Sequence, residues 1–251
     1  MTVNLRHFPL LTTQSAFPQW ANAKVQDIEA MEASLMALRE KDVSPGHGDG
    51  SQIAELLHYM RLLGHRRKAN HKEMEHIVIR YEFMNRDTSP FKDELIKLAY
   101  FMREIGLQEE PKRDTVDMVV EYMDSTATQA NSATRGEIMA TCHLYLKLLG
   151  HPQKVTGSQI GFMYAAIEEN AKIGLPLVSN EILLHMKRLG LTDRALDYEL
   201  LKERLERARK ERDGLTIARI LNMVRECPPS ALESGNQPDL PPVSVWRGGD
   251  G

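Results

Sequence analysis

Four stretches of the chain share one pattern of apolar and polar positions, and each stretch closes with a glycine. Counted back from Gly64, Gly106, Gly150 and Gly190, apolar residues stand one, four and eight positions earlier. This spacing places them on one face of an α-helix. The glycines stand 42, 44 and 40 residues apart, and each follows the last periodic residue, where a residue without Cβ readily ends a helix. The pattern predicts a repeated helix that stops at each glycine.

A second amphipathic stretch follows each of these helices. After Gly64, for example, Met74, Ile77, Tyr81 and Met84 fall close to helical spacing. Turn-forming residues separate the stretches, so each unit is predicted to be a helical hairpin. A single hairpin cannot bury its apolar face alone, and neighbouring units must therefore stack. We predict an all-α fold, an α-solenoid of about four helix-turn-helix repeats over residues 51–214.

The two ends of the chain have a different character. Residues 1–50 are predicted to be an N-terminal extension with one helix over 25–41, which can cap the first repeat. Residues 215–226 are predicted to form a second capping helix. Five of the chain's 12 prolines lie within 227–251, so this segment is predicted to be an extended, Pro-rich tail.

Composition excludes several classes of protein. Of the 251 residues, 42% are apolar, which is enough to form a core, and the formal charge of −3 argues against a strongly basic nucleic-acid or membrane binder. No apolar run approaches the roughly 20 residues of a membrane span, so we expect a soluble intracellular protein without a membrane span. Cys142 and Cys227 are the only cysteines, too few for a disulfide framework or a thiolate metal cluster.

The hairpin units with a small residue at the turn resemble the pentatricopeptide and tetratricopeptide superfamily of helical repeats. The segment 179–190 looks most like the first helix of a pentatricopeptide repeat. In members that read RNA, the resemblance implies that the fifth residue of that helix helps to select a base. The matching residues are Glu55, Lys97, Thr141 and Glu181. Only Thr141 is small and polar, and two carboxylates would repel phosphate, so the resemblance supports the fold and argues against a base-reading code.

A cation stands three positions before each glycine: Arg61, Arg103, Lys147 and Lys187. One interpretation is a basic stripe that follows a nucleic-acid backbone. The other, which we favour, is that positive charge in a last helical turn complements the helix dipole, for about 0.3–1 kcal/mol at each site.

Two further features are candidate partner-binding sites. The basic loop of Arg66, Arg67 and Lys68 can contact RNA or an acidic protein surface, although a solvated turn is the more frequent meaning of such a run. Trp246 lies on the polar tail, where it has no core of its own to enter, and we predict that it anchors a partner.

We find no sequence signature of catalysis. The chain has no Gly-rich phosphate loop and no nucleophile or zinc-protease motif, and Cys142 occupies an apolar column. We therefore expect no enzyme activity, no cofactor, no metal site and no small-molecule substrate. Residues 1–26 contain no acid and include Arg6 and Lys24, a composition typical of mitochondrial targeting segments.

These observations lead to two hypotheses of function. The first is a non-catalytic scaffold or accessory subunit that binds protein subunits of a large mitochondrial assembly, such as an ATP synthase, a respiratory complex or a mitochondrial ribosome. The alternative is an RNA-binding, pentatricopeptide-like protein that acts in organellar RNA processing or translation.

Overall fold

The computed structural model describes residues 18–229, apart from 45, 87–88, 109–110, 112 and 130–131. Within this part of the chain there are ten α-helices, one short 3-10 helix, η1 (Gln19–Ala21), and no strands. The prediction of an all-α fold is confirmed.

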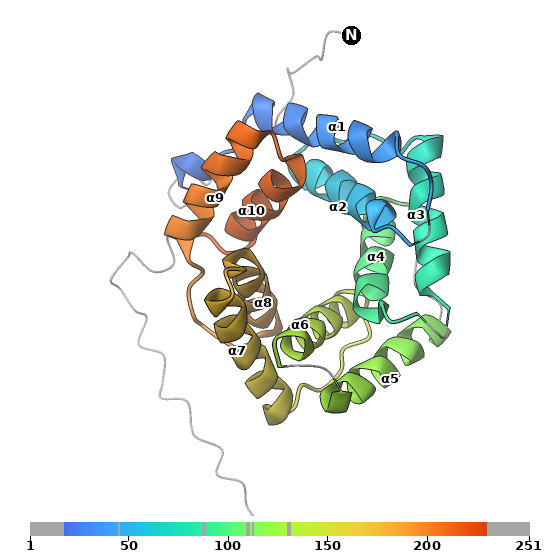
Figure 1. Ribbon diagram of the computed structural model, residues 1–251, viewed down its shortest axis with the longest axis vertical. Helices are drawn as coiled ribbons and strands as arrows, with labels where there is room; N and C mark the ends of the chain where they lie inside the picture. The colour runs from blue at the N-terminus through green and yellow to red at the C-terminus, as the bar shows by residue number, and fades with distance from the viewer. Residues whose placement is uncertain are drawn as a thin grey trace, which may run out of the picture.

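The helices alternate between an outer and an inner layer (Figure 1). The outer helices are α1 (Val25–Arg39), α3 (His71–Met84), α5 (Arg113–Gln129), α7 (Gly157–Lys172) and α9 (Tyr198–Glu211). The inner helices are α2 (Asp49–Leu62), α4 (Lys92–Glu104), α6 (Ser132–Leu148), α8 (Pro176–Leu189) and α10 (Gly214–Glu226). Each outer helix runs back along its inner neighbour, so the inner helices run parallel to one another. We call the side of the ring where the inner helices end the C-terminal face.

The predicted glycine stops are confirmed. Gly64, Gly106, Gly150 and Gly190 follow α2, α4, α6 and α8, and each has a left-handed backbone with φ between 80° and 89°. In this conformation the next residue can turn back to bond the helix, as His65 N does to Met60 O at 2.9 Å. Each of these inner helices therefore ends at its glycine, and the chain continues into the loop that leads to the next outer helix.

The predicted open stack differs from the structure, in which the helices form a closed ring (Figure 1). The helices that the sequence placed as caps at opposite ends lie against each other, because α10 packs on both α1 and α2. Arg209 of α9 also binds Asp27 of α1 through two bonds, of 2.9 and 2.7 Å. Each cap has an apolar face, and packing the two together buries both at once; in α1, Met31 and Leu35 are fully buried.

The register of α10 marks it as a fifth inner helix. If Pro228 takes the place of the stop glycine, Arg225 stands three positions before it, as the other cations do. A second column supports this alignment: Gly50, Gly136 and Gly214 each stand fourteen positions before the stop. The ring therefore contains five outer–inner hairpins instead of four repeats and two caps.

These three glycines lie where an inner helix crosses the next outer helix. A Cβ at Gly50 would collide with the backbone of His76, and one at Gly136 with the backbone of Phe162. A Cβ at Gly214 would collide with Ala30 of α1 in the same way. Thus α1, although it is the first helix of the chain, packs on α10 in the place that the next outer helix takes in the other hairpins.

We expect Gly214→Ala to lower the free energy of unfolding by about 1–3 kcal/mol, because the added methyl forces α1 and α10 apart. The matched control is Gly161→Ala in α7, where a Cβ meets nothing within 4 Å. There alanine should stabilise the protein by about 0.5–1 kcal/mol. Urea denaturation measures both changes, and equal effects of the two substitutions would contradict the close crossing that closes the ring.

Candidate functional site

The cations that precede the stops bind the end of the neighbouring inner helix. Four of these contacts pass around the ring: Arg61 Nη1 donates to Glu104 O at 2.7 Å, Arg103 Nη2 to Leu148 O at 2.9 Å, Lys147 Nζ to Arg188 O at 2.9 Å, and Arg225 Nη1 to Leu62 O at 2.7 Å. Lys187 differs, because its Nζ donates to Asp193 O and Arg194 O in the loop after its own helix.

These bonds explain the column of cations in terms of helix ends. The last carbonyls of a helix have no partner within it, and parallel helices bring five negative dipole ends to one face. The helix-dipole interpretation placed each cation at the negative end of its own helix. Arg61, Arg103 and Lys147 instead donate hydrogen bonds to carbonyls at the end of the next inner helix. These side chains hold adjacent repeats together.

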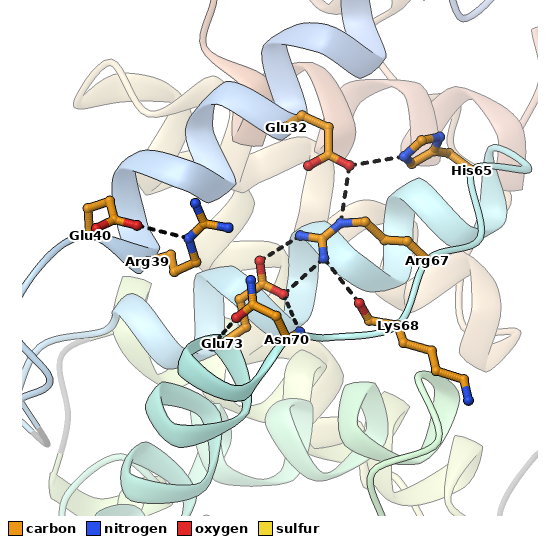
Figure 2. A network of polar contacts seen from close by, with 8 residues as sticks. All are labelled: Glu32, Arg39, Glu40, His65, Arg67, Lys68, Asn70 and Glu73. Atoms are coloured by element: carbon orange, nitrogen blue, oxygen red, sulfur yellow. Dashed lines mark hydrogen bonds and ion pairs between the residues drawn. The ribbon is translucent and has the colours of Figure 1, made fainter. Parts of the chain in front are cut away.

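Arg67 from the predicted basic loop forms ion pairs with two carboxylates of the ring itself (Figure 2). Its guanidinium binds both carboxylate oxygens of Glu73, at 2.6 and 3.0 Å, and lies 3.1 Å from Glu32. His65 Nε2 lies 3.0 Å from the same Glu32 carboxylate. Glu73 also accepts from the backbone N–H of Asn70 and so caps α3. Arg67 therefore ties α1, the loop and α3 together.

The remaining predicted partner-binding residues have different positions. Arg66 and Lys68 are exposed on the C-terminal face, beside the network of Figure 2. Trp246 lies outside the described residues. Cations outnumber acids in the described inner helix ends and the loops that follow them: 61–70, 103–108, 147–156, 187–197 and 225–229 contain eleven Arg and Lys against four Asp and Glu.

A layer of charged side chains lies in the middle of the ring, with Glu55 buried and its three partners partly exposed. It comes from the column nine positions before the stop: Glu55 of α2, Lys97 of α4, Glu181 of α8 and Arg219 of α10. Lys97 Nζ lies 3.1 Å from Glu181 and 3.4 Å from Glu55, and Arg219 binds Glu55 through two bonds of 2.9 and 2.7 Å. Two carboxylates and two cations make the layer neutral. We call these four residues the ion layer.

Mutual attraction keeps the ion layer ionised. Burial alone would raise the pKa of Glu181, but Lys97 and Arg219 outweigh it and lower this pKa to about 2. Burial likewise opposes the charge of Lys97, whereas Glu181 and Glu55 raise its pKa above the usual range. Each charge therefore depends on partners from other helices.

A layer of rings lies between the ion layer and the C-terminal face. His58, Tyr100 and Phe101 contact one another with ring centroids 5.1–5.8 Å apart, and Tyr145 connects them to His185 at 5.8 Å. Burial lowers the pKa of both His58 and His185 to about 4, so both imidazoles are neutral at pH 7. The Nδ1 atom of each is buried and has no hydrogen-bond partner among the described residues.

A pocket descends through this layer between α8 and α10. Its lining runs from Arg188, in the last turn of α8, to Glu181 and Arg219 of the ion layer. Polar groups predominate in between: Tyr59, Tyr145, His185 and Asn222, beside the apolar Leu184 and Met223. The Oδ1 atom of Asn222 is buried without a hydrogen-bond partner among the described residues. We call this space the axial pocket, and it is the candidate functional site.

A second and larger pocket, of about 400 Å³, lies where α1 meets α9 and α10, and Glu29, Arg209 and Lys210 contribute to its lining. Cys142 is fully buried, and burial raises the pKa of its thiol well above the usual range, so it packs as an apolar residue. No group of three His, Cys, Asp or Glu side chains within 18–229, its gaps aside, is placed to hold a metal ion. None of the helices in the described part of the chain has the length and apolar character needed to cross a bilayer.

Sequence reasoning placed Glu55, Lys97 and Glu181 in one column without recognising that this column faces the axis. Charges of opposite sign at one repeat position were the available signal for an ion layer. Arg219 and Asn222 were missed because α10 is followed by Pro228 where the other inner helices have a glycine, and so did not match the pattern. For His185 the available signal was a histidine in the column, five positions before the stop, that is otherwise aromatic in α2, α4 and α6.

Comparison with known proteins gives no relative: no protein-family model matches the chain, and no curated protein or solved structure matches it. The site is therefore interpreted from its own geometry.

We expect Glu55→Gln to lower the free energy of unfolding by about 1–3 kcal/mol, because it removes the buried counter-charge of the partly exposed Arg219 and Lys97. The control is Glu203→Gln, which removes an exposed pair with Arg207 and should cost about 0.5 kcal/mol or less. Chemical denaturation at pH 7 measures both. If both variants match the wild type, the ion layer does not couple the inner helices.

The buried histidines should make the protein less stable in mild acid. Because the pKa of His58 and of His185 is about 4 in the folded protein, only the unfolded chain takes up these protons between pH 6.5 and 4. Stability is therefore lost as pH falls through this window, by on the order of 2 kcal/mol for each histidine at pH 5.

Urea denaturation at pH 7.5 and pH 5 measures this loss, and His185→Gln should reduce it by the share of one histidine. His47→Gln, at an exposed position, should lose as much stability as the wild type. An equal loss in all three proteins would show that the histidines of the ring layer are not responsible.

Proposed function

We propose that this protein is a non-catalytic, protein-binding subunit of a multi-subunit assembly, and that the C-terminal face is its principal docking surface. The observation that carries the proposal is the closed ring with a filled axis. An open solenoid can hold a strand along its concave side. Here that side is occupied by the ion layer and the ring layer, so a partner meets a broad face instead.

The charge of the C-terminal face favours an acidic partner surface. Seven of its eleven cations are exposed: Arg61, Arg66, Lys68, Lys147, Lys154, Arg194 and Arg225. The chain as a whole has a net charge of −3, so this face differs in sign from the rest of the molecule. Such a distribution steers and orients an oppositely charged protein.

We further propose that the hairpins are degenerate pentatricopeptide-like units and that the assembly is mitochondrial. The support is the repeated inner helix with its glycine stop, together with the acid-free composition of residues 1–26. An ATP synthase, a respiratory complex or a mitochondrial ribosome is an assembly of the expected kind. The competing proposal, RNA binding in organellar RNA processing or translation, rests on the same exposed cations.

A charge-reversal experiment separates the two. The tagged full chain is purified from a mitochondrial fraction, with and without RNase, and the co-purifying proteins are identified by mass spectrometry. The triple variant Arg66→Glu, Lys68→Glu and Lys154→Glu reverses exposed cations that are not part of the contacts between helix ends, so the ring should stay folded. We expect it to lose the partner subunits, whereas RNase should not release them.

The control triple variant Arg86→Glu, Lys172→Glu and Lys210→Glu makes the same change in charge at exposed positions away from the C-terminal face, and should keep the partners. Release of the partners by RNase, or RNA binding that weakens by orders of magnitude as salt rises to the physiological range, would favour the RNA-binding alternative.

A further inference from the structure

The five hairpins of the ring do not pack on one another equally closely. Every other pair of neighbouring inner helices is in extensive contact, whereas α8 and α10 touch at only a few positions. Each of α2, α4, α6 and α10 also packs on the outer helix that follows it around the ring, but α8 has hardly any contact with α9. At the repeat position where Gly50, Gly136 and Gly214 allow a close crossing, α8 has Pro176. We call this boundary, between α8 and the α9–α10 hairpin, the seam.

The series of bonds between helix ends is interrupted at the seam. At the four other boundaries a cation in a last helical turn donates to a carbonyl of the neighbouring inner helix. Lys187 of α8 instead donates to Asp193 O and Arg194 O of the loop after its own helix. Arg188 Nε and Glu226 Oε2 lie 3.6 Å apart across the seam, and their side chains are 27% and 28% exposed. A partly exposed pair at this distance contributes little to stability.

Buried polar atoms on both sides of the seam lack partners. His185 of α8 is 4% exposed, and its Nδ1 has no hydrogen-bond partner among the described residues. The same is true of Asn222 Oδ1 of α10. The axial pocket between them has a volume of about 20 Å³, room for about one water molecule. A buried polar atom without a partner costs about 1–3 kcal/mol, so hydration of these atoms in an opened seam offsets part of the cost of separating α8 from α10.

The α9–α10 hairpin is held more firmly on its other side. Arg209 of α9 binds the buried Asp27 of α1 through two bonds, and Gly214 N of α10 donates to Ser34 Oγ of α1 at 3.0 Å. Helix α10 also packs extensively on α1 and α2. The last hairpin is therefore joined to the first one. The loosest boundary of the ring lies within the chain and not where the first and last helices meet.

We propose that the ring opens and closes at the seam. In the open state the α9–α10 hairpin stays on α1 and α2 and moves away from α8, and the loop 190–197 takes up the change. Glu181 and Arg219, which line the axial pocket from α8 and α10, then become accessible from the side of the ring. The closed ring becomes an open solenoid with an accessible concave side. This inference concerns the ring itself and does not depend on which partner the protein binds.

Thiol labelling of the folded full chain tests the proposal. Leu184→Cys places a thiol on the α8 wall of the seam, and the matched control Leu144→Cys places one at the same repeat position in α6. Both leucines are buried, at 4% and 1% exposure. Iodoacetamide is added without denaturant, and mass spectrometry follows each cysteine separately. We expect the thiol of Leu184→Cys to react about 10-fold or more faster than that of Leu144→Cys, because a local opening requires less free energy than global unfolding.

Urea provides a second criterion, with the buried Cys142 as the reference for global unfolding. Opening of the seam exposes less surface, so labelling of Leu184→Cys should rise less steeply with urea than labelling of Cys142. If circular dichroism shows that Leu184→Cys is unfolded, Met223→Cys places the thiol on the α10 wall instead. Equal rates at the seam, at Leu144→Cys and at Cys142 would overturn the proposal, because the ring would then open only by unfolding as a whole. A faster reaction of Leu144→Cys would overturn it too.

Asn222→Leu changes the seam itself. It replaces the unpaired amide with an apolar side chain of similar size, so the closed seam no longer buries an unpaired oxygen. We expect it to slow the labelling of Leu184→Cys several-fold and to leave that of Leu144→Cys unchanged. If Asn222→Leu does not alter the labelling of Leu184→Cys, this thiol reacts without separation of α8 from α10, and the proposal fails.

Discussion

The parallel ends of the inner helices on one face are the constraint on which the rest of the ring depends. Each end leaves carbonyls without a partner, and dipole ends of like sign lie side by side. The ring resolves both problems with a cation in a last turn that reaches the neighbouring helix. Since donor and acceptor come from different repeats, the bond forms only when neighbours stack in register. The bond from Arg225 to the carbonyl of Leu62 extends this dependence from the last inner helix to the first, so an interaction at helix ends also favours closure.

Closure in turn decides what can occupy the axis. The inner column that faces the axis is partly shielded from solvent, and charges there lose hydration that close partners replace. Lys97 of α4 and Arg219 of α10 each pair with Glu55 of the neighbouring α2, and Lys97 also crosses the axis to Glu181 of α8. A buried ion layer adds little net stability over an apolar core of similar shape. Its effect here is to fix the relative positions of helices that are far apart in sequence.

The sequence predicts the hairpins well because their signals are local. The apolar columns and the glycines fix where the inner helices lie and end, and both survive in the structure. Closure of the ring could not be predicted in this way, because it depends on the small rotation between successive hairpins, and no single column of residues determines that rotation. The glycines at 50, 136 and 214 are the one sequence signal of closure. Each stands where an inner helix crosses the next outer helix, and for α10, the last helix, that outer helix is α1. The axial pocket could not be predicted, because one of its walls is α10, a helix that the repeat pattern did not include.

The pocket lies where the repeat pattern changes. Five positions before the stop, α2, α4 and α6 carry Tyr59, Phe101 and Tyr145, whose rings fill one side of the axis. The same position holds a histidine in α8, whose ring packs against Tyr145, and a methionine in α10, where the series of rings ends. Space therefore remains beside these two helices, above a neutral layer of paired charges and below the basic C-terminal face. Where the column of rings is interrupted, buried polar atoms of His185 and Asn222 have no partner among the described residues.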